Sequence, residues 1–272
     1  MVWRRPNFAK CLACWVVLFL FACDRAPQQP VHRVASRATS QPVLTDGDDA
    51  RTIIANVVAA HGGEHAAARW RCGYVKYRTT GGILPAQLGV CIVEDTFRLP
   101  GRFSRVTRMD AEGRDVRMVW VVNDGKGWSR FDNGPVTPFD NNITDRREHP
   151  FADFCRTTAI AQPEVQVTKL GSVQIEGRPT VGVRVASAQL VDSEMWFSAQ
   201  TGLLVLVRKT LPADNPAGPG VVETTLGEYA HVQGAPIPML IKATRDGKIM
   251  LEVKLMEVRF AEKFDDSVFS KP

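Results

Sequence analysis

Short runs of alternating apolar and polar residues, separated by turn residues, make up most of the chain after residue 70. The alternation predicts β-strands with one buried face, because successive side chains of a strand point to opposite sides of a sheet. Turn signals such as Asn123-Asp124-Gly125 and Asp132-Asn133-Gly134 divide the runs. The predicted strands are 72–80, 87–98, 102–109, 114–123, 127–132, 164–171, 180–188, 192–198, 203–210, 221–231, 238–245 and 249–260. Short, regularly spaced strands predict a mainly β fold with an antiparallel sheet or barrel.

Two segments have helical periodicity instead. Apolar residues recur at helical spacing from Ile53 to Val58, and Gly62-Gly63 ends this helix. A short helical turn at 64–70 follows it. The second helix is expected over 145–162, where Phe151, Phe154, Cys155 and Ala159 share one face.

The N-terminus has the pattern of an export signal. Arg4, Arg5 and Lys10 precede an apolar run from Cys11 to Ala22. Twelve residues are too few for a membrane-spanning helix, which needs roughly 20. A basic start with a short apolar run is typical of a secretory signal peptide, which we assign to residues 1–22.

The end of this signal, Leu20-Phe21-Ala22-Cys23, resembles the lipobox of bacterial lipoproteins. The resemblance implies that the Cys23 thiol carries a diacylglyceryl group and that further acylation, such as palmitate, gives a lasting membrane anchor. The alternative is an ordinary secretory signal followed by an incidental cysteine. Asp24 resembles the signal that keeps lipoproteins in the inner membrane. We therefore expect a bacterial envelope protein that faces the periplasm, with the inner membrane slightly favoured.

Residues 23–49 differ in composition from the rest of the chain. They are rich in Pro, Gln, Ser, Arg and Asp and have no apolar periodicity. Such a stretch buries too little surface to offset its ordering entropy, so it is interpreted as a tether behind the lipidated Cys23. Without a second linker, residues 50–272 are expected to form a single domain.

Composition and charge exclude several classes of protein. The chain has 272 residues, of which 44% are hydrophobic and 23% charged, which excludes wholesale disorder and a collagen-like repeat. The net charge of +5 suggests a nucleic-acid ligand. However, residues 1–22 contain three basic and no acidic residues, so the remainder has 31 basic and 29 acidic residues. A net charge of +2 gives no support for nucleic-acid binding.

Three cysteines remain after Cys23, namely Cys72, Cys91 and Cys155. If Gly81-Gly82 formed a two-residue hairpin turn, residue 72 would face residue 91, and a Cys72–Cys91 disulfide could form in an oxidising compartment. The alternatives are two buried thiols, or a longer loop through Pro85 that changes the register. None of the three belongs to a C-x-x-C pair, so no zinc site is expected.

No catalytic or cofactor motif is present. His61, Glu64 and His65 resemble metal ligands, but their order is not H-E-x-x-H, and two glycines interrupt the helix. We expect His61 at a helix C-terminus, where positive charge is favourable. The sequence has neither a G-x-S-x-G elbow nor a phosphate-binding loop. We expect a protein that is not an enzyme and has no metal and no cofactor.

Several short motifs, in their order along the chain, resemble the LolA/LolB-like superfamily of envelope lipoprotein-sorting proteins. They are Ala60-His61-Gly62-Gly63, residues 123–128 (NDGKGW), residues 194–204 (EMWFSAQTGLL), and a tail motif made of residues 229–234, Pro238 and residues 264–269. The resemblance covers nearly all of residues 50–272. It implies an open, strongly curved antiparallel sheet, an incomplete barrel of about eleven strands, with helices packed on its concave face and room for acyl chains between them.

The apolar runs 118–122 and 203–207 have both faces away from water, as expected for a core or for a lipid-binding groove. The candidate lipid-binding residues are Trp120, Trp128, Phe131, Phe151 and Phe154, although a role in the core is favoured for each of them. We expect a tethered, non-enzymatic protein that binds or carries a lipid or a lipoprotein acyl chain. The alternative is a structural or regulatory envelope protein that binds a protein partner through a sheet edge or the concave face.

Overall fold

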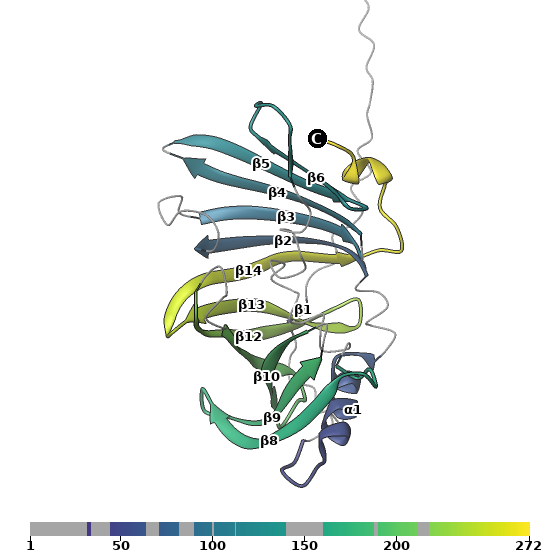
Figure 1. Ribbon diagram of the computed structural model, residues 1–272, viewed down its shortest axis with the longest axis vertical. Coiled ribbons are helices and arrows are strands. Elements are labelled where there is room, and N and C mark those ends of the chain that lie inside the picture. The colour runs from purple at the N-terminus through teal and green to yellow at the C-terminus, as the bar shows by residue number, and fades with distance from the viewer. Residues whose placement is uncertain are drawn as a thin grey trace, which may run out of the picture. The chain divides into compact units, whose positions relative to one another are not determined.

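The computed structural model describes residues 32–33, 44–63, 71–81, 90–99, 101–111, 113–139, 160–187, 190–211 and 218–272 (Figure 1). Residues Val31–Pro272 belong to one compact unit. The signal peptide, Cys23 and the helical turn at 64–70 lie outside the described residues, as does nearly all of the helix expected over 145–162. These assignments therefore remain predictions.

Within the described ranges, fourteen strands form one sheet in which every pair of neighbours is antiparallel. The strands are β1 (His32–Arg33), β2 (Cys72–Gly81), β3 (Val90–Arg98), β4 (Arg102–Ala111), β5 (Arg114–Asn123), β6 (Lys126–Phe131), β7 (Thr137–Phe139), β8 (Gln166–Ile175), β9 (Arg178–Ser187), β10 (Leu190–Ser198), β11 (Leu204–Leu211), β12 (Gly220–Val232), β13 (Ala235–Arg245) and β14 (Lys248–Phe260). The mainly β fold class is confirmed.

The order of strands in the sheet is β7-β6-β5-β4-β3-β2-β14-β13-β12-β11-β10-β9-β8, with β1 paired to β12. The first and last long strands, β2 and β14, therefore meet in the middle, and each half of the sheet is a meander that runs outward from this pair (Figure 1). β7 and β8 stand at opposite ends of the order. The sheet is thus open, as expected.

Each predicted strand has an observed counterpart, but the expected number of about eleven strands is too low. The two unpredicted strands are β1 and β7. β7 has three residues, one of them Pro138, and β1 has two, so neither is long enough to show a period of two. They are recognised as strands only by their backbone pairing, β7 with β6 and β1 with β12.

The helices differ from expectation. The described part contains one α-helix, α1 (Ala50–Ala60), and one short 3-10 helix, η3 (Asp266–Phe269). The Asp49 carboxylate caps α1 by accepting a hydrogen bond from the Thr52 backbone N–H. α1 contacts β8, whereas η3 contacts β4 and β5. The prediction of several helices packed together on one face is therefore wrong for the described residues.

The two faces of the sheet follow from register and alternation. The inner face is defined as the face that carries Val75, Val93, Ile241 and Val253. These residues belong to the same buried cluster as Ile53, Ile54 and Val57 of α1. The opposite face is called the outer face. On it, η3 packs against β4 and β5 and buries Phe269 completely. The inner face therefore holds the main core and the outer face a smaller one.

The folded domain begins earlier than residue 50. Leu44 is 2% exposed and belongs to the main buried cluster, and its backbone N–H donates to the carbonyl of Ala199 at 2.9 Å. The neighbouring Lys169 side chain contacts Asp46. Part of the segment that we assigned to the tether therefore contacts the domain, with Leu44 buried at the β10–β11 turn and Asp46 held by Lys169 and Ser172 of β8.

Candidate functional site

A continuous apolar band crosses the inner face from β12 to β5. Its members face one another on successive strands and are each 7% exposed or less: Leu226, Ile241, Val253, Thr79, Cys91, Met109 and Val116. With neighbouring strands about 4.8 Å apart, the band is about 29 Å long. Thr79 is its one polar member, and its hydroxyl has no hydrogen-bond partner. A second apolar row, Val183–Met195–Val207, joins β9, β10 and β11 on the same face.

A charged cluster lies beside this band on the inner face. Arg105 donates to both carboxylate oxygens of Asp95, from Nε at 2.8 Å and from an Nη at 2.9 Å. The Tyr77 hydroxyl donates to the same carboxylate at 3.1 Å. Asp95 is fully buried, and the Arg105 side chain is 12% exposed. A bidentate pair of this kind neutralises both charges inside an apolar face.

The aromatic environment of this cluster comes from three strands. The Arg105 guanidinium lies 5.2 Å from the centre of the Phe103 ring. Trp120 pairs with Arg105 across β4 and β5, and its ring lies 6.1 Å from that of Phe139. Burial raises the pKa of the Tyr77 phenol, and the nearby Asp95 carboxylate raises it further. The phenol therefore stays protonated and acts as a donor to Asp95.

Sequence reasoning missed the Tyr77–Asp95–Arg105 cluster, although a signal was present. Asp95 follows Cys91 and Val93 at the positions of β3 that point inward, and Arg105 occupies the inward phase of β4 between Phe103 and Thr107. Opposite charges at core positions of two consecutive strands indicate a buried ion pair. The signal becomes specific only once the register between β3 and β4 is known.

The five candidate aromatics do not line one pocket. Trp120 is half-buried on the inner face, whereas Trp128 pairs with Val121 and lies on the outer face. Phe131 pairs with Met118 on the inner face but is 58% exposed. Phe151 and Phe154 lie outside the described residues. Of the described three, Trp120 and Phe131 are on the side of the apolar band, and Trp128 is on the opposite side.

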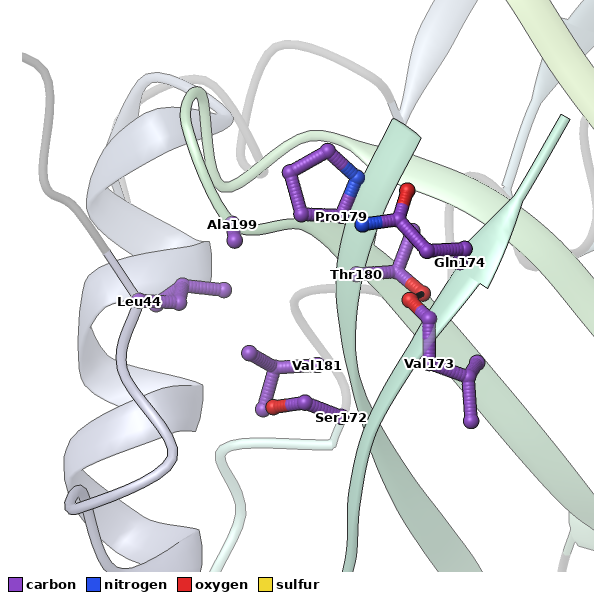
Figure 2. Close-up of a pocket in the computed structure, with 8 residues that line it drawn as sticks. All are labelled: Leu44, Ser172, Val173, Gln174, Pro179, Thr180, Val181 and Ala199. Carbon is purple, nitrogen blue, oxygen red and sulfur yellow. Dashed lines mark hydrogen bonds between the residues drawn. The ribbon is translucent and has the colours of Figure 1, made fainter. Parts of the chain in front are cut away.

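A small open pocket of about 330 Å³ lies between the Leu44 segment and the hairpin of β8 and β9. Figure 2 shows Leu44 and Val181 directed toward each other across it, with Ala199 nearby. The remaining lining residues are Ser172, Val173, Gln174, Pro179 and Thr180. The Thr180 hydroxyl donates to the Val173 carbonyl at 2.8 Å, and no lining residue carries a charge. The pocket is suited to a small apolar group rather than to an ion.

His61 caps the C-terminal end of α1, as predicted, but it does not carry the expected positive charge. Its Nδ1 lies 2.8 Å from the Val57 carbonyl, and its Nε2 accepts from the Leu204 backbone N–H at 3.4 Å. The neutral tautomer with a proton on Nδ1 satisfies both contacts. Burial lowers the pKa of His61 to about 4. His61 is therefore a neutral core residue that joins α1 to β11.

The two described cysteines do not form the disulfide that was one of the possibilities considered from the sequence. Cys72 faces Arg98, and Cys91 faces Thr79, so the two cysteines are separated by the length of the β2–β3 pair. Both are buried free thiols. The disulfide required a two-residue turn at Gly81-Gly82, but Thr80 pairs with Val90, so the connection is longer and the register is changed, as in the alternative stated above. Burial raises the pKa of both thiols.

Two further geometric properties bear on the site. Within the described ranges, no three His, Cys, Asp or Glu side chains are grouped as metal ligands would be. No helix in that part of the chain is sufficiently long and apolar to cross a bilayer.

Solved structures share this arrangement of strands. A LolA superfamily protein from Nitrosomonas europaea matches with a TM-score of 0.50 and 10% identity, covering 83% of this chain and 99% of its own. The chain has a LolA-like fold. A DUF1329 family protein from Desulfovibrio piger matches this LolA-like fold with a TM-score of 0.54 and 8% identity, covering 82% of this chain and 98% of its own. No protein-family model matches the sequence, and no curated protein matches it.

Proposed function

We propose that this chain is a non-enzymatic protein of the bacterial envelope that binds a lipid or a lipoprotein acyl chain on the inner face of its sheet. Cys23 would hold it at the membrane, facing the periplasm. The observation that carries the proposal is the continuous apolar band across seven neighbouring strands, from Leu226 to Val116. The resemblance to LolA superfamily proteins supports it through the fold.

The proposed mechanism is desolvation. Each methylene moved from water to an apolar environment contributes about 0.8 kcal/mol, so ten buried methylenes contribute about 8 kcal/mol. The side chains of the band are already buried, so an acyl chain would have to displace their present neighbours. This competition keeps the net affinity moderate, as a protein that both takes up and releases its ligand requires.

The charged cluster would limit where an acyl chain lies. Asp95 and Arg105 neutralise each other, but the bidentate pair is polar and would not be covered by a methylene chain without cost. We expect the chain to follow the band through Cys91 and Met109, with Trp120 and Arg105 at its border.

A photoreactive fatty acid tests this proposal. Residues 24–272 are exported to a bacterial periplasm, incubated with a diazirine fatty acid, irradiated and mapped by mass spectrometry. Label is expected at inner-face residues such as Met109 and Met195, and not at Trp128 or Met256 of the outer face. Equal labelling of both faces, or no labelling, would exclude the inner face as the binding site.

A pair of variants sharpens the test. Cys91→Trp fills the band, whereas Val106→Trp adds an indole to the outer face of the neighbouring strand. Both variants are checked for an unchanged circular dichroism spectrum. Loss of label in Cys91→Trp and its retention in Val106→Trp support the proposal, and retention in both contradicts it.

A second candidate function is binding of a protein partner at the β8 end of the sheet. β8 ends the order of described strands, Val173 on it is 45% exposed, and the small pocket of Figure 2 lies beside it. An added strand would pair with β8 and place an apolar side chain in this pocket. Val173→Arg would abolish capture of such a partner and leave fatty-acid labelling unchanged.

A further inference from the structure

Four basic side chains form a row on the outer face of the central strands. Lys254 of β14 pairs with Arg78 of β2, Arg78 pairs with Ile92 of β3, Ile92 pairs with Arg108 of β4, and Arg108 pairs with Arg117 of β5. These five strands lie next to one another in Figure 1. With strands about 4.8 Å apart, the row spans about 19 Å. We call Lys254, Arg78, Arg108 and Arg117 the basic row.

The basic row is exposed and has no ion-pair partner among the described residues. The same face of the sheet shows the opposite arrangement between β9 and β12. There, Arg184 and Arg208 both contact Glu194, at 3.0 and 3.2 Å, and Arg208 also contacts Glu223 at 2.8 Å. The two arginines between β9 and β12 are thus compensated by neighbouring carboxylates, whereas Arg78, Arg108 and Arg117 have no such partner among the described residues.

The acidic side chains nearest to the basic row have other partners. Glu94 pairs with Lys76 at 3.2 Å, and Glu252 pairs with Lys242 at 3.4 Å. Asp110 accepts a hydrogen bond from the Gly113 backbone N–H at 2.7 Å. Asp115, opposite Asp110 on the same face, is the remaining acid, and the two carboxylates together offset two of the four positive charges of the row. The row therefore keeps a positive charge.

Exposed apolar side chains adjoin one end of these strands. Ile249 and Met250, at the start of β14, are 69% and 43% exposed, and Val90 at the start of β3 is 39% exposed. Lys248 precedes them and is also exposed. The Met250 backbone lies against Gly81, so β14 brings these residues to the end of β2. Basic residues next to exposed aliphatic residues are the combination that binds the interface of an anionic bilayer.

We propose that the basic row, with Ile249 and Met250, docks on a membrane surface that contains anionic phospholipid. The arginines would pair with phosphate groups through their planar guanidinium donors, and the two apolar side chains would enter the interface. The predicted anchor at Cys23 would raise the effective concentration of the basic row at the membrane. The row lies on the face opposite the apolar band, so membrane docking can be tested independently of acyl-chain binding.

The test uses the full chain, purified in detergent and reconstituted into two kinds of vesicle. One kind contains phosphatidylcholine alone, and the other also contains phosphatidylglycerol. Hydroxyl-radical labelling is read out by mass spectrometry at Ile249 and Met250, with exposed Phe131 of the inner face as the internal reference. We expect protection of Ile249 and Met250 in the anionic vesicles only, with loss of this protection at high salt.

Two double variants distinguish an effect of the basic row itself from an effect of the net charge of the protein. Each Lys or Arg near an anionic surface changes the docking equilibrium about fivefold, so Arg78→Gln with Arg108→Gln should lower the docked-to-undocked ratio about 25-fold. Arg178→Gln with Lys271→Gln removes the same charge from exposed positions outside the row and should leave protection unchanged. All four side chains are exposed, so both variants are expected to fold, which circular dichroism checks.

Three results would overturn the proposal. The first is equal labelling of Ile249 and Met250 in both kinds of vesicle, and the second is an equal loss of protection in the two double variants. The third is protection by soluble polyglutamate without protection by anionic vesicles, which would assign the row to an acidic protein.

Discussion

His61 is buried between α1 and β11, and its environment favours the neutral ring. Burial lowers the pKa of His61 to about 4 in the folded chain, against 6.5 for an exposed histidine. Its contribution to stability is therefore fully present above pH 6.5 and is lost as the pH falls from 6.5 to 4. The shift corresponds to about 3 kcal/mol of unfolding free energy.

Denaturant unfolding at several pH values measures this effect. Between pH 6.5 and pH 4, the free energy of unfolding of the wild-type chain should fall by about 3 kcal/mol more than that of His61→Gln. The variant has no titrating ring at this position. Parallel curves for the two proteins would show that His61 does not titrate in this range.

The buried pair Asp95–Arg105 provides a second test at the scale of residues. Arg105→Met leaves the Asp95 carboxylate buried without its bidentate partner and should reduce the free energy of unfolding by about 3–5 kcal/mol. Adding Asp95→Leu removes the uncompensated charge, so the double variant should be more stable than Arg105→Met. Urea unfolding of the wild type, both single variants and the double variant completes the cycle. Additive losses would contradict a coupled pair.

Residue positions were predicted better from the sequence than residue environments. The helical period correctly placed His61 at the end of α1, but its charge depends on its burial, to which residues distant in the sequence such as Leu204 and Phe197 contribute. Cys72 and Cys91 were correctly placed on adjacent strands, but the sequence left open whether they face each other, and the register shows that they do not. In both cases the missing information was a long-range contact, which local periodicity does not contain.

At the scale of elements, the pair β9–β10 depends on a glycine. Trp196 lies opposite Gly182, and a Cβ on Gly182 would lie 2.5 Å from the indole ring. Gly182→Ala should therefore destabilise the protein by about 1–3 kcal/mol through overpacking. Gly227→Ala in β12 is a matched control, because a Cβ there has no atom within 4 Å.

Urea midpoints of the two alanine variants give the comparison. Gly227→Ala should be neutral or slightly stabilising, since alanine restricts the unfolded chain. If Gly182→Ala were equally neutral, the close contact between Gly182 and Trp196 would not contribute to stability.

The strands were predictable because alternation is a local property. All strands of six residues or more appear at their predicted places, whereas β7 and β1 were found only through pairing with β6 and β12. Helices packed on one face were implied by the family resemblance rather than by the residues. In the described part, α1 contacts β8 and η3 contacts β4 and β5, so this implication is not met there.

At the scale of the whole molecule, the two faces should act separately. Arg78→Gln with Arg108→Gln should leave photoreactive fatty-acid labelling unchanged, because the basic row is on the outer face. Conversely, Cys91→Trp should leave the protection of Met250 on anionic vesicles unchanged. Both labelling experiments on both variants measure this separation. A variant that impairs both properties while it remains folded would show that the faces are coupled.

The meeting of β2 and β14 in the middle of the sheet has a consequence for folding kinetics. This pairing joins strands from opposite ends of the chain, whereas almost all others join consecutive strands. A circular permutant that is cut between β7 and β8, and in which residue 272 is linked to residue 44, would pair β8 through β14 and then β2 through β7 in chain order. Its lower contact order should speed refolding in stopped-flow experiments. The slow step of the natural chain would then be the closure of its own longest loop.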